Sequence, residues 1–440
     1  MDPGLISLIG VLLSLSLLIY LAYKGFPILF LSIISMLPMI LLSGGNINEL
    51  IQENYMTGFA NFAQRNWLIF FFSAVFGQMM GDSGAAKVIA YTFAGFARKF
   101  PGKEQLVAIL TLIFISSTLS YGGISVYVLV FTMVAISKEI FQELDIPWHM
   151  YTCNGLAAGV ITMSMIPGTP SIQNIMPTEY LGTTTMAAPI LGLILAVLAL
   201  IMGVGYIEFR LRQAQKRGEG FYKTGYRIAE SDIKTETDIP NIPLWLCFLP
   251  SIVLFLFMNI LKFSPPISLL ITITVTYLLF YKHLKGIFAT IQKATTNTLN
   301  AVGATCSVVG FGTVVAALPA FQYIISGLDK IPGPPVVQLV IAVNIASAIT
   351  GSSAGGLGVG LQVFGQRFID QGIPAPVIHR LAVVSAGGLD SLPHNGVVIN
   401  SLAVMRLTHK ESYLNTFVTS VVIPIICAFV GAMLYQMGIW

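Results

Sequence analysis

The sequence predicts an all-α polytopic membrane protein, built from two inverted repeats with re-entrant hairpins and broken transmembrane helices. Three observations lead to this prediction. First, 55% of the 440 residues are hydrophobic and 10% are charged, whereas soluble domains carry about 25% charged residues. Second, several uncharged runs reach the roughly 20 residues that a helix needs to cross the hydrocarbon core. Third, glycine and proline interrupt apolar sequence at corresponding places in the two halves of the chain.

Six runs have the length and composition of a single membrane span. They are residues 4–23, 25–45, 180–207, 239–261, 263–281 and 412–440.

Three further runs are too long for one span, because a helix rises about 1.5 Å per residue. We expect each of these runs to fold back or to break. Polar, glycine-rich tips at residues 116–123 and 350–356 predict that two of them are hairpins of short helices at membrane depth. The three runs are residues 105–137, 294–328 and 331–366.

The distribution of basic residues predicts the topology. Residues 210–238 hold the densest group of lysines and arginines, so the positive-inside rule assigns them to the cytoplasm. Lys24 is the first basic residue and follows the first span, so we expect the N-terminus outside. The chain then divides into a first repeat (1–209), a cytoplasmic linker (210–243) and a second repeat (244–440).

The two halves carry the same features in the same order. Each has two spans, an amphipathic stretch, a glycine-rich segment, a hairpin and a broken segment. In each break an asparagine stands seven positions after a proline, from Pro167 to Asn174 and from Pro393 to Asn400. The first amphipathic stretch is acidic and the second is basic. This difference predicts that the two copies have opposite orientations in the membrane.

The broken segments point to a transporter. Residues 387–396 (Gly-Gly-Leu-Asp-Ser-Leu-Pro-His-Asn-Gly) place Asp390 and His394 in apolar surroundings. A charge near the bilayer centre costs roughly 2.5 kcal/mol or more, so it persists where it has a partner or a task. The backbone groups that glycine and proline release are tolerated where they line a cavity for ions or substrate. Residues 166–174 form the matching break in the first half.

Polar residues at the hairpin tips and breaks are the candidates for substrate binding. A hydroxycarboxylate needs oriented N–H groups, which helix N-termini supply, and small hydroxyl and amide side chains for its hydroxyls. The alternative is that these small residues only allow helices to pack closely. The candidates are Ser117, Thr118, Ser120, Thr350, Ser352 and Ser353 at the tips, and Thr169, Ser171, Asn174, Ser391, Asn395 and Asn400 at the breaks.

Asp390 and His394 are the candidates for proton coupling. Histidine titrates near physiological pH, and a desolvated aspartate can be shifted to do the same. The alternative roles are a helix cap for Asp390 and a structural hydrogen bond for His394. Asp82 precedes a segment that could begin a half-helix, so we expect it to cap that helix, with coupling as its alternative.

Other notable residues have structural interpretations. Lys87, His379 and Arg380 stand near predicted segment ends, where we expect them to extend to the interface. Attraction of the substrate is the alternative role for each. Thr408 and Glu411 have the spacing of a capping box. The cysteines lie in apolar segments at no metal-ligand spacing, so we predict neither a metal nor a cofactor. The four tryptophans stand at segment edges, which is typical of an aromatic belt; they are Trp67, Trp148, Trp245 and Trp440.

Two segments resemble signatures of the gluconate permease (GntP) family. Residues 387–396, followed by Leu-Thr-His-Lys-Glu-Ser-Tyr at 407–413, resemble its C-terminal signature. Residues 76–86 (Phe-Gly-Gln-Met-Met-Gly-Asp-Ser-Gly-Ala-Ala) resemble its N-terminal signature. The resemblance extends over nearly the whole chain in length and segment order.

This resemblance implies proton-coupled symport of a sugar acid such as gluconate, or of a short hydroxy acid such as 3-hydroxybutyrate or lactate. It implies a homodimer in the lipid bilayer of a prokaryotic cytoplasmic membrane. A substrate-carrying domain would move against a scaffold, either as an elevator or by rocking.

Three alternatives stay open. A sodium-coupled carrier of di- or tricarboxylates would use the same oxygen-rich breaks, although few cationic side chains stand near them. A channel is another alternative, but paired breaks are more typical of a carrier that works by alternating access. A membrane-embedded enzyme is the last alternative, but the sequence contains neither a His-Glu-x-x-His nor a Gly-x-Ser-x-Gly motif. The net charge of +4, spread over segment ends, does not indicate nucleic acid as a partner.

Overall fold

The computed structural model describes residues 2–24, 26–121, 126–169, 171–229, 240–261, 263–284, 286–328 and 333–440. Over these residues the chain is helical without a strand, which confirms the all-α class. Four described helices are long and apolar enough to cross a membrane, and shorter apolar helices accompany them. The four are Pro3–Leu21, Pro189–Lys216, Ile287–Ala317 and His409–Gln436. The protein is therefore a polytopic membrane protein.

The first half is a series of helices of very different lengths, in which π-helical and 3₁₀ turns carry η labels. In order they are α1 (Pro3–Tyr23), α2 (Ile28–Ile34), α3 (Leu37–Ser43), α4 (Ile47–Glu49), η1 (Leu50–Tyr55), α5 (Met56–Asp82), α6 (Ala85–Ala97), α7 (Glu104–Tyr121), α8 (Val126–Glu143), η2 (Trp148–Asn154), α9 (Gly155–Ala157), η3 (Ala158–Thr162), α10 (Ile172–Leu181) and α11 (Pro189–Lys216).

The second half follows two short helices of the linker, α12 (Phe221–Thr224) and α13 (Tyr226–Ala229). Its elements are α14 (Leu244–Phe255), η5 (Leu256–Ile260), α15 (Pro265–Phe280), α16 (Ile287–Ala317), α17 (Pro319–Leu328), α18 (Pro335–Thr350), α19 (Ser353–Asp370), α20 (Ala375–Leu389), α21 (Gly396–Met405), α22 (His409–Phe417), η6 (Val418–Val422) and α23 (Ile423–Gln436). The order of elements resembles that of the first half, whereas the inverted relation between the halves stays a prediction.

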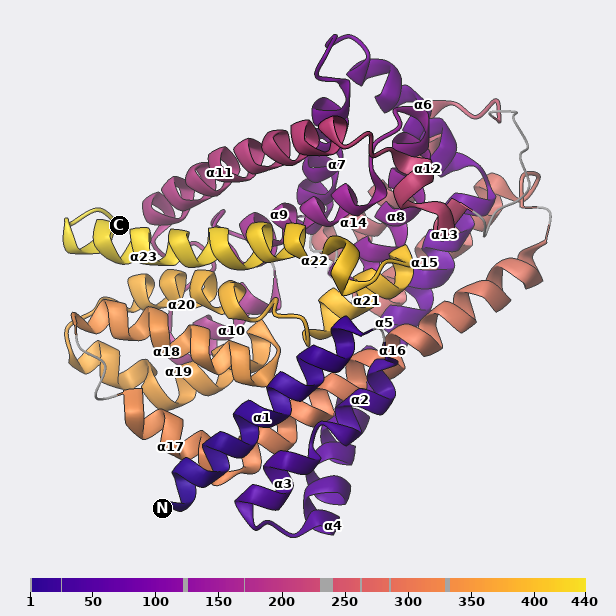
Figure 1. Cartoon of the computed structure of the whole chain (residues 1–440). Coiled ribbons are helices and arrows are strands. Elements are labelled where there is room, and N and C mark those ends of the chain that lie inside the picture. Colours follow the sequence, from indigo (N-terminus) through magenta and orange to yellow (C-terminus); the bar gives the residue numbers. More distant parts are fainter. Residues whose placement is uncertain are drawn as a thin grey trace.

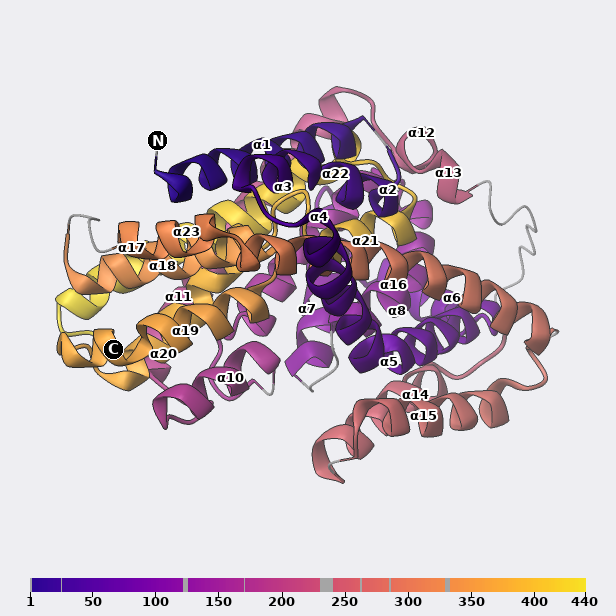
Figure 2. The same ribbon diagram turned by 90° about the horizontal axis from the view of Figure 1, so that it is seen from below.

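The helices form two groups that meet near the middle of the molecule. Figures 1 and 2 show α17, α18, α19, α20 and α23 on one side, and α5, α6, α8, α14 and α15 on the other. The break that precedes α21 lies between the two groups. The first-half helix α10 packs against α19 and α20, and the second-half helix α15 packs against α5. Each group therefore contains segments from both halves of the sequence.

Two features expected as separate segments form single long helices. The amphipathic stretches and glycine-rich segments merge into η1–α5 in the first half and α16 in the second, and α5 packs along α16. Glycine allows this contact, because a Cβ at Gly58 would lie 2.1 Å from the Oγ1 of Thr313. A Cβ at Gly310 would lie 2.7 Å from the Tyr55 carbonyl oxygen.

The over-long runs fold back or break as predicted. The run 331–366 contains the hairpin of α18 and α19 from Pro335 onward, which turns at Gly351 with a φ of 58°. Residues 105–137 form α7 and α8, which pack together, although the turn at 122–125 lies outside the described residues. The run 294–328 breaks at Leu318, between α16 and α17. The predicted span 25–45 differs, because it divides into the two short helices α2 and α3.

Local predictions had mixed outcomes. The capping box is confirmed, since the Thr408 N–H donates to the Glu411 Oε2 at 2.7 Å. Asp82 does not cap α6: it ends α5, and its Oδ2 accepts from the Thr290 Oγ1 at 2.6 Å. Trp148 is fully buried and donates its Nε1–H to the Met405 carbonyl at 2.9 Å. It belongs to the interior, so the aromatic-belt prediction was wrong for this tryptophan.

Candidate functional site

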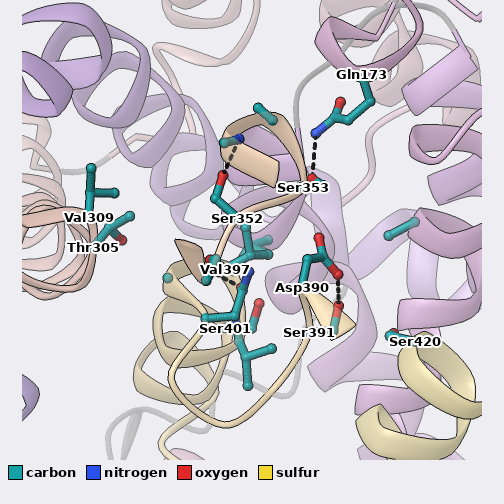
Figure 3. Close-up of a pocket in the computed structure, with 18 of the residues that line it drawn as sticks. Gln173, Thr305, Val309, Ser352, Ser353, Asp390, Ser391, Val397, Ser401 and Ser420 are labelled. Carbon is teal, nitrogen blue, oxygen red and sulfur yellow. Dashed lines mark hydrogen bonds between the residues drawn. The ribbon is translucent and has the colours of Figure 1, made fainter. Parts of the chain in front are cut away.

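A cavity of about 830 Å³ lies where the two groups of helices meet. Several elements form its wall: α5, α7, α8, the turns η2 to η3, α10, α16, the tip of the α18–α19 hairpin, the second break with α21, and the junction of α22 and η6. Figure 3 shows part of this wall, with side chains from both halves of the chain pointing into one space. Pockets of this volume are typical of small-molecule sites.

Three helix N-termini converge on the cavity. Ser352 caps α19 by accepting the Gly355 N–H at 3.3 Å, and Asn395 caps α21 by accepting the Val397 N–H at 2.7 Å. The third, α10, begins at Ile172 and contributes its first turn to the cavity wall. Each N-terminus carries unsatisfied N–H groups and a partial positive charge. Together they favour an anion in the cavity.

Asp390 is the centre of a polar network in the wall. Its side chain is buried and accepts a hydrogen bond from the Ser391 Oγ at 2.8 Å. Ser353, at the hairpin tip, lies close enough to this carboxylate to interact with it. The Ser353 Oγ in turn accepts from the Gln173 Nε2 at 3.1 Å, as Figure 3 shows. The network therefore joins α10 of the first half to the hairpin tip and break of the second.

Arg65 is the one cationic side chain among the described residues that line the cavity. It continues a polar stripe on α5 that begins with Thr57 and Asn61, at the four-residue spacing that keeps side chains on one helix face. Thr305 and Thr313 line the cavity from α16. From the sequence we interpreted this region only as an amphipathic stretch. The spacing of Thr57, Asn61 and Arg65 is the signal that could have revealed the polar stripe.

The structure brings about half of the predicted site residues together at this cavity. Seven predicted residues lie elsewhere in described parts of the chain. The side chain of Thr350 lies outside the described part. Ser120, Ser352, Ser353, Asp390, Ser391 and Asn395 line the cavity, whereas Ser117, Thr118, Thr169, Ser171, Asn174, His394 and Asn400 do not.

The polar residues of the first break hydrogen-bond within the break itself. The Thr169 Oγ1 donates to the Ile166 carbonyl at 2.9 Å, and Ser171 caps α10 by accepting the Asn174 N–H at 3.2 Å. The Asn174 amide nitrogen donates to the carbonyls of Thr169 and Thr185, at 2.8 and 3.0 Å. These contacts hold the irregular backbone around α10 in place.

Arg380 binds the same irregular backbone from α20. It is fully buried, and its Nε and Nη2 donate to the Ala187 carbonyl at 2.9 and 2.6 Å. Further guanidinium bonds reach the carbonyls of Ser164 and Thr185. Carbonyls that the break releases from helical bonding are thus satisfied by this side chain. The prediction that Arg380 extends to the membrane interface was wrong.

His379 lies beside Arg380 and is also buried. Its Nδ1 is 2.7 Å from the Thr183 Oγ1, and its Nε2 is 3.0 Å from the Asn174 Oδ1. The interfacial position predicted for His379 was therefore wrong as well. The side chain of Lys87, the third residue of that prediction, lies outside the described part of the chain.

His394 and Asn400 lie in the second break and in α21 without facing the cavity. His394 is buried behind the hairpin tip, where its Nε2 is 3.0 Å from the Ala348 carbonyl oxygen. Its Nδ1 and both amide atoms of Asn400 have no hydrogen-bond partner among the described residues. The geometry around His394 corresponds to the structural hydrogen bond named above as its alternative role.

The chain is similar to a curated transporter along nearly its entire length. It is 32% identical over 461 residues to the uncharacterized transporter YxjC of Bacillus subtilis (strain 168). The match covers 94% of this chain and 96% of YxjC. No family model matches the chain. The described residues contain no group of three or more His, Cys, Asp or Glu side chains that could hold a metal ion.

Proposed function

Since the chain belongs to the transporter family of YxjC, we propose that it carries a small hydroxycarboxylate across the membrane together with protons. The substrate is a sugar acid of the gluconate type or a short hydroxy acid such as 3-hydroxybutyrate or lactate, as members of the GntP family carry. The direction is uptake across a prokaryotic cytoplasmic membrane. The N-terminus is outside, the linker 210–243 is cytoplasmic, and the working unit is a homodimer.

The convergence of three helix N-termini on one cavity is the observation that carries this proposal. The first turns of α10, α19 and α21 all line the same space. Their N–H groups can receive a carboxylate. Hydroxyl groups of the substrate find small polar partners such as Ser120, Ser401 and Ser420 in the same wall.

Arg65 anchors the substrate carboxylate in this proposal. A guanidinium offers two parallel N–H groups to a carboxylate, which fixes the orientation of the ligand as well as attracting it. Thr57 and Asn61 lie on the same face of α5 and line the same cavity. They are placed to bind hydroxyls near the carboxylate end of the substrate.

Asp390 is the proton-coupling residue in this proposal. It lines the cavity that holds the substrate, and it has hydroxyl partners in Ser391 and Ser353. Protonation would remove a negative charge from a cavity that binds an anion, so proton and substrate favour each other's binding. His394 supports the hairpin tip behind this site and is the second coupling candidate.

A sodium-coupled carrier of a dicarboxylate is the second candidate function. Arg65 gives the cavity a cationic group, which would help to hold a doubly charged anion even though few cationic side chains stand near the breaks. The Oδ1 of Asn154, whose residue lines the cavity, has no hydrogen-bond partner among the described residues. Such an oxygen is a suitable ligand for Na⁺.

Uptake by purified protein in proteoliposomes tests the proposal. Labelled gluconate, 3-hydroxybutyrate, lactate, citrate and succinate are each offered under an imposed pH gradient or an imposed sodium gradient. Accumulation of a monocarboxylate under the pH gradient alone is the expected result. Sodium-dependent accumulation of citrate or succinate would contradict the proton-coupled proposal and support the second candidate function.

A further inference from the structure

A second cavity lies on the outer surface of the helices, away from the central site. It has a volume of about 390 Å³ and lies between α6 and α7. Its lining is apolar apart from one threonine and includes Phe93, Phe96, Leu110 and Phe114. Phe114 is 71% exposed and Phe96 is 46% exposed, so the groove opens to the surroundings of the protein. In a membrane protein those surroundings are lipid chains.

Basic residues stand at one end of this groove. The loop between α6 and α7 contains Lys99 and Lys103, both exposed. Its third cation, Arg98, is paired with Glu143. No ion pair involves Lys99 or Lys103 within the described residues. The two lysines therefore offer positive charge at the end of the groove where the chain leaves the helices.

The groove matches the length of one lipid chain in one leaflet. Phe114 lies ten residues into α7 from Glu104, which is about 15 Å along the helix axis. This is about half of the roughly 30 Å thickness of the hydrocarbon core. An acyl chain whose headgroup lies at the Lys99–Lys103 loop would thus end beside Phe114, near the middle of the bilayer.

We propose that this groove binds an anionic phospholipid, with one acyl chain along α6 and α7 and the phosphate at Lys99 and Lys103. The wall on the α6 side is supported by α14, since Phe93 packs edge-on against Phe248 with ring centroids 6.1 Å apart. Basic groups at the cytoplasmic ends of transmembrane helices recognise anionic headgroups in this way. The site is separate from the transport cavity, because the two share no lining residue.

Native mass spectrometry of the full-length protein in detergent tests this site. The protein is titrated with phosphatidylglycerol or with phosphatidylcholine of the same acyl chains. We expect phosphatidylglycerol to bind about ten-fold more tightly, and the double variant Lys99→Gln/Lys103→Gln to lose this preference. The matched double variant Lys282→Gln/Lys293→Gln, which removes two lysines outside the loop, should keep it. Free glycerol phosphate should not compete with phosphatidylglycerol, because the acyl chain of the lipid contributes to binding.

Filling the groove separates a lipid-chain site from a purely electrostatic one. Leu110→Trp should weaken binding of both lipids, whereas Leu193→Trp on the exposed face of α11 should not. Equal affinity for the two lipids would overturn the proposal. An unchanged preference in the Lys99→Gln/Lys103→Gln protein would overturn it too, even if Leu110→Trp does not fold. Competition by glycerol phosphate would show a phosphate site without a lipid chain, which also contradicts it.

Discussion

The side-chain amide of Gln173 donates a hydrogen bond to the Ser353 hydroxyl at 3.1 Å. The two residues stand 180 positions apart, one in the first turn of α10 and the other at the start of α19. Through Ser353 the contact continues to the carboxylate of Asp390. The central cavity is thus assembled by both halves of the chain. Separate variants can therefore test the cavity, the hydrogen bonds that hold the first break, and the α18–α19 hairpin.

Arg65→Gln should weaken substrate binding while leaving the protein folded. A hydrogen bond to a charged group contributes about 1.5–3 kcal/mol, so we expect KM for uptake to rise roughly ten- to a hundred-fold. Arg212→Gln is the matched control, because Arg212 is exposed and pairs with Glu208 on α11. Initial rates of uptake against substrate concentration measure the effect. Equal KM values for wild type and Arg65→Gln would show that Arg65 does not bind the substrate.

Asn174→Ala should destabilise the protein without changing substrate affinity. Its amide bonds the carbonyls of Thr169 and Thr185 and the ring of His379. Leaving a buried polar group unpaired costs about 1–3 kcal/mol, so the melting temperature in detergent should fall. Ser401→Ala, at the cavity, should show the opposite pattern of a raised KM with little change in melting. A raised KM for Asn174→Ala at unchanged melting would contradict this assignment.

Gly356→Ala should disrupt the α18–α19 hairpin. A Cβ at this position would lie 2.1 Å from the Ser347 Oγ and 2.5 Å from the Ser347 Cα, so the two helices must separate. Overpacking of this kind costs about 1–3 kcal/mol. The control is Gly358→Ala two residues later, whose Cβ would make an ordinary contact at 3.6 Å with the Met176 Sδ. Thermal melting of the two variants should differ, and equal melting would rule out close packing here.

His149 should make stability depend on pH. Burial lowers the pKa of His149 below its ordinary value of 6.5, although Glu219 lies 3.0 Å from its Nε2 and acts in the other direction. The unfolded chain therefore binds the proton first as pH falls below 6.5, and the free energy of unfolding decreases. His149→Gln should reduce the loss of stability between pH 7 and pH 5. Identical pH profiles of thermal melting for the two proteins would contradict this prediction.

Features that depend on local sequence could be predicted. The turn at Gly351 follows from a run too long for one span and from a glycine-rich tip. The capping box at Thr408 and Glu411 depends on two residues three positions apart. In both cases the interacting groups are close in the sequence, so spacing alone contains the information.

Features that depend on distant partners could not be predicted. The partners of Arg380 are the carbonyls of Ser164, Thr185 and Ala187, which stand 193 to 216 positions away in the sequence. Nothing near Arg380 in the sequence indicates them. Trp148 is buried for a similar reason, because its ring packs against Phe221 of the linker and its Nε1–H bonds the Met405 carbonyl. Arg65 was missed for the same reason. The polar stripe on α5 lines a cavity only because α16 and the second break, which are distant in the sequence, form the rest of its wall.

The most direct test compares two modes of transport in Asp390→Asn proteoliposomes. One assay measures accumulation of the labelled acid under an imposed pH gradient, and the other measures exchange of labelled for unlabelled acid without a gradient. The variant should retain exchange, because the helix N-termini and Arg65 still bind the anion, and it should lose gradient-driven accumulation. Normal accumulation by Asp390→Asn would contradict the assignment of proton coupling to the carboxylate in the central cavity.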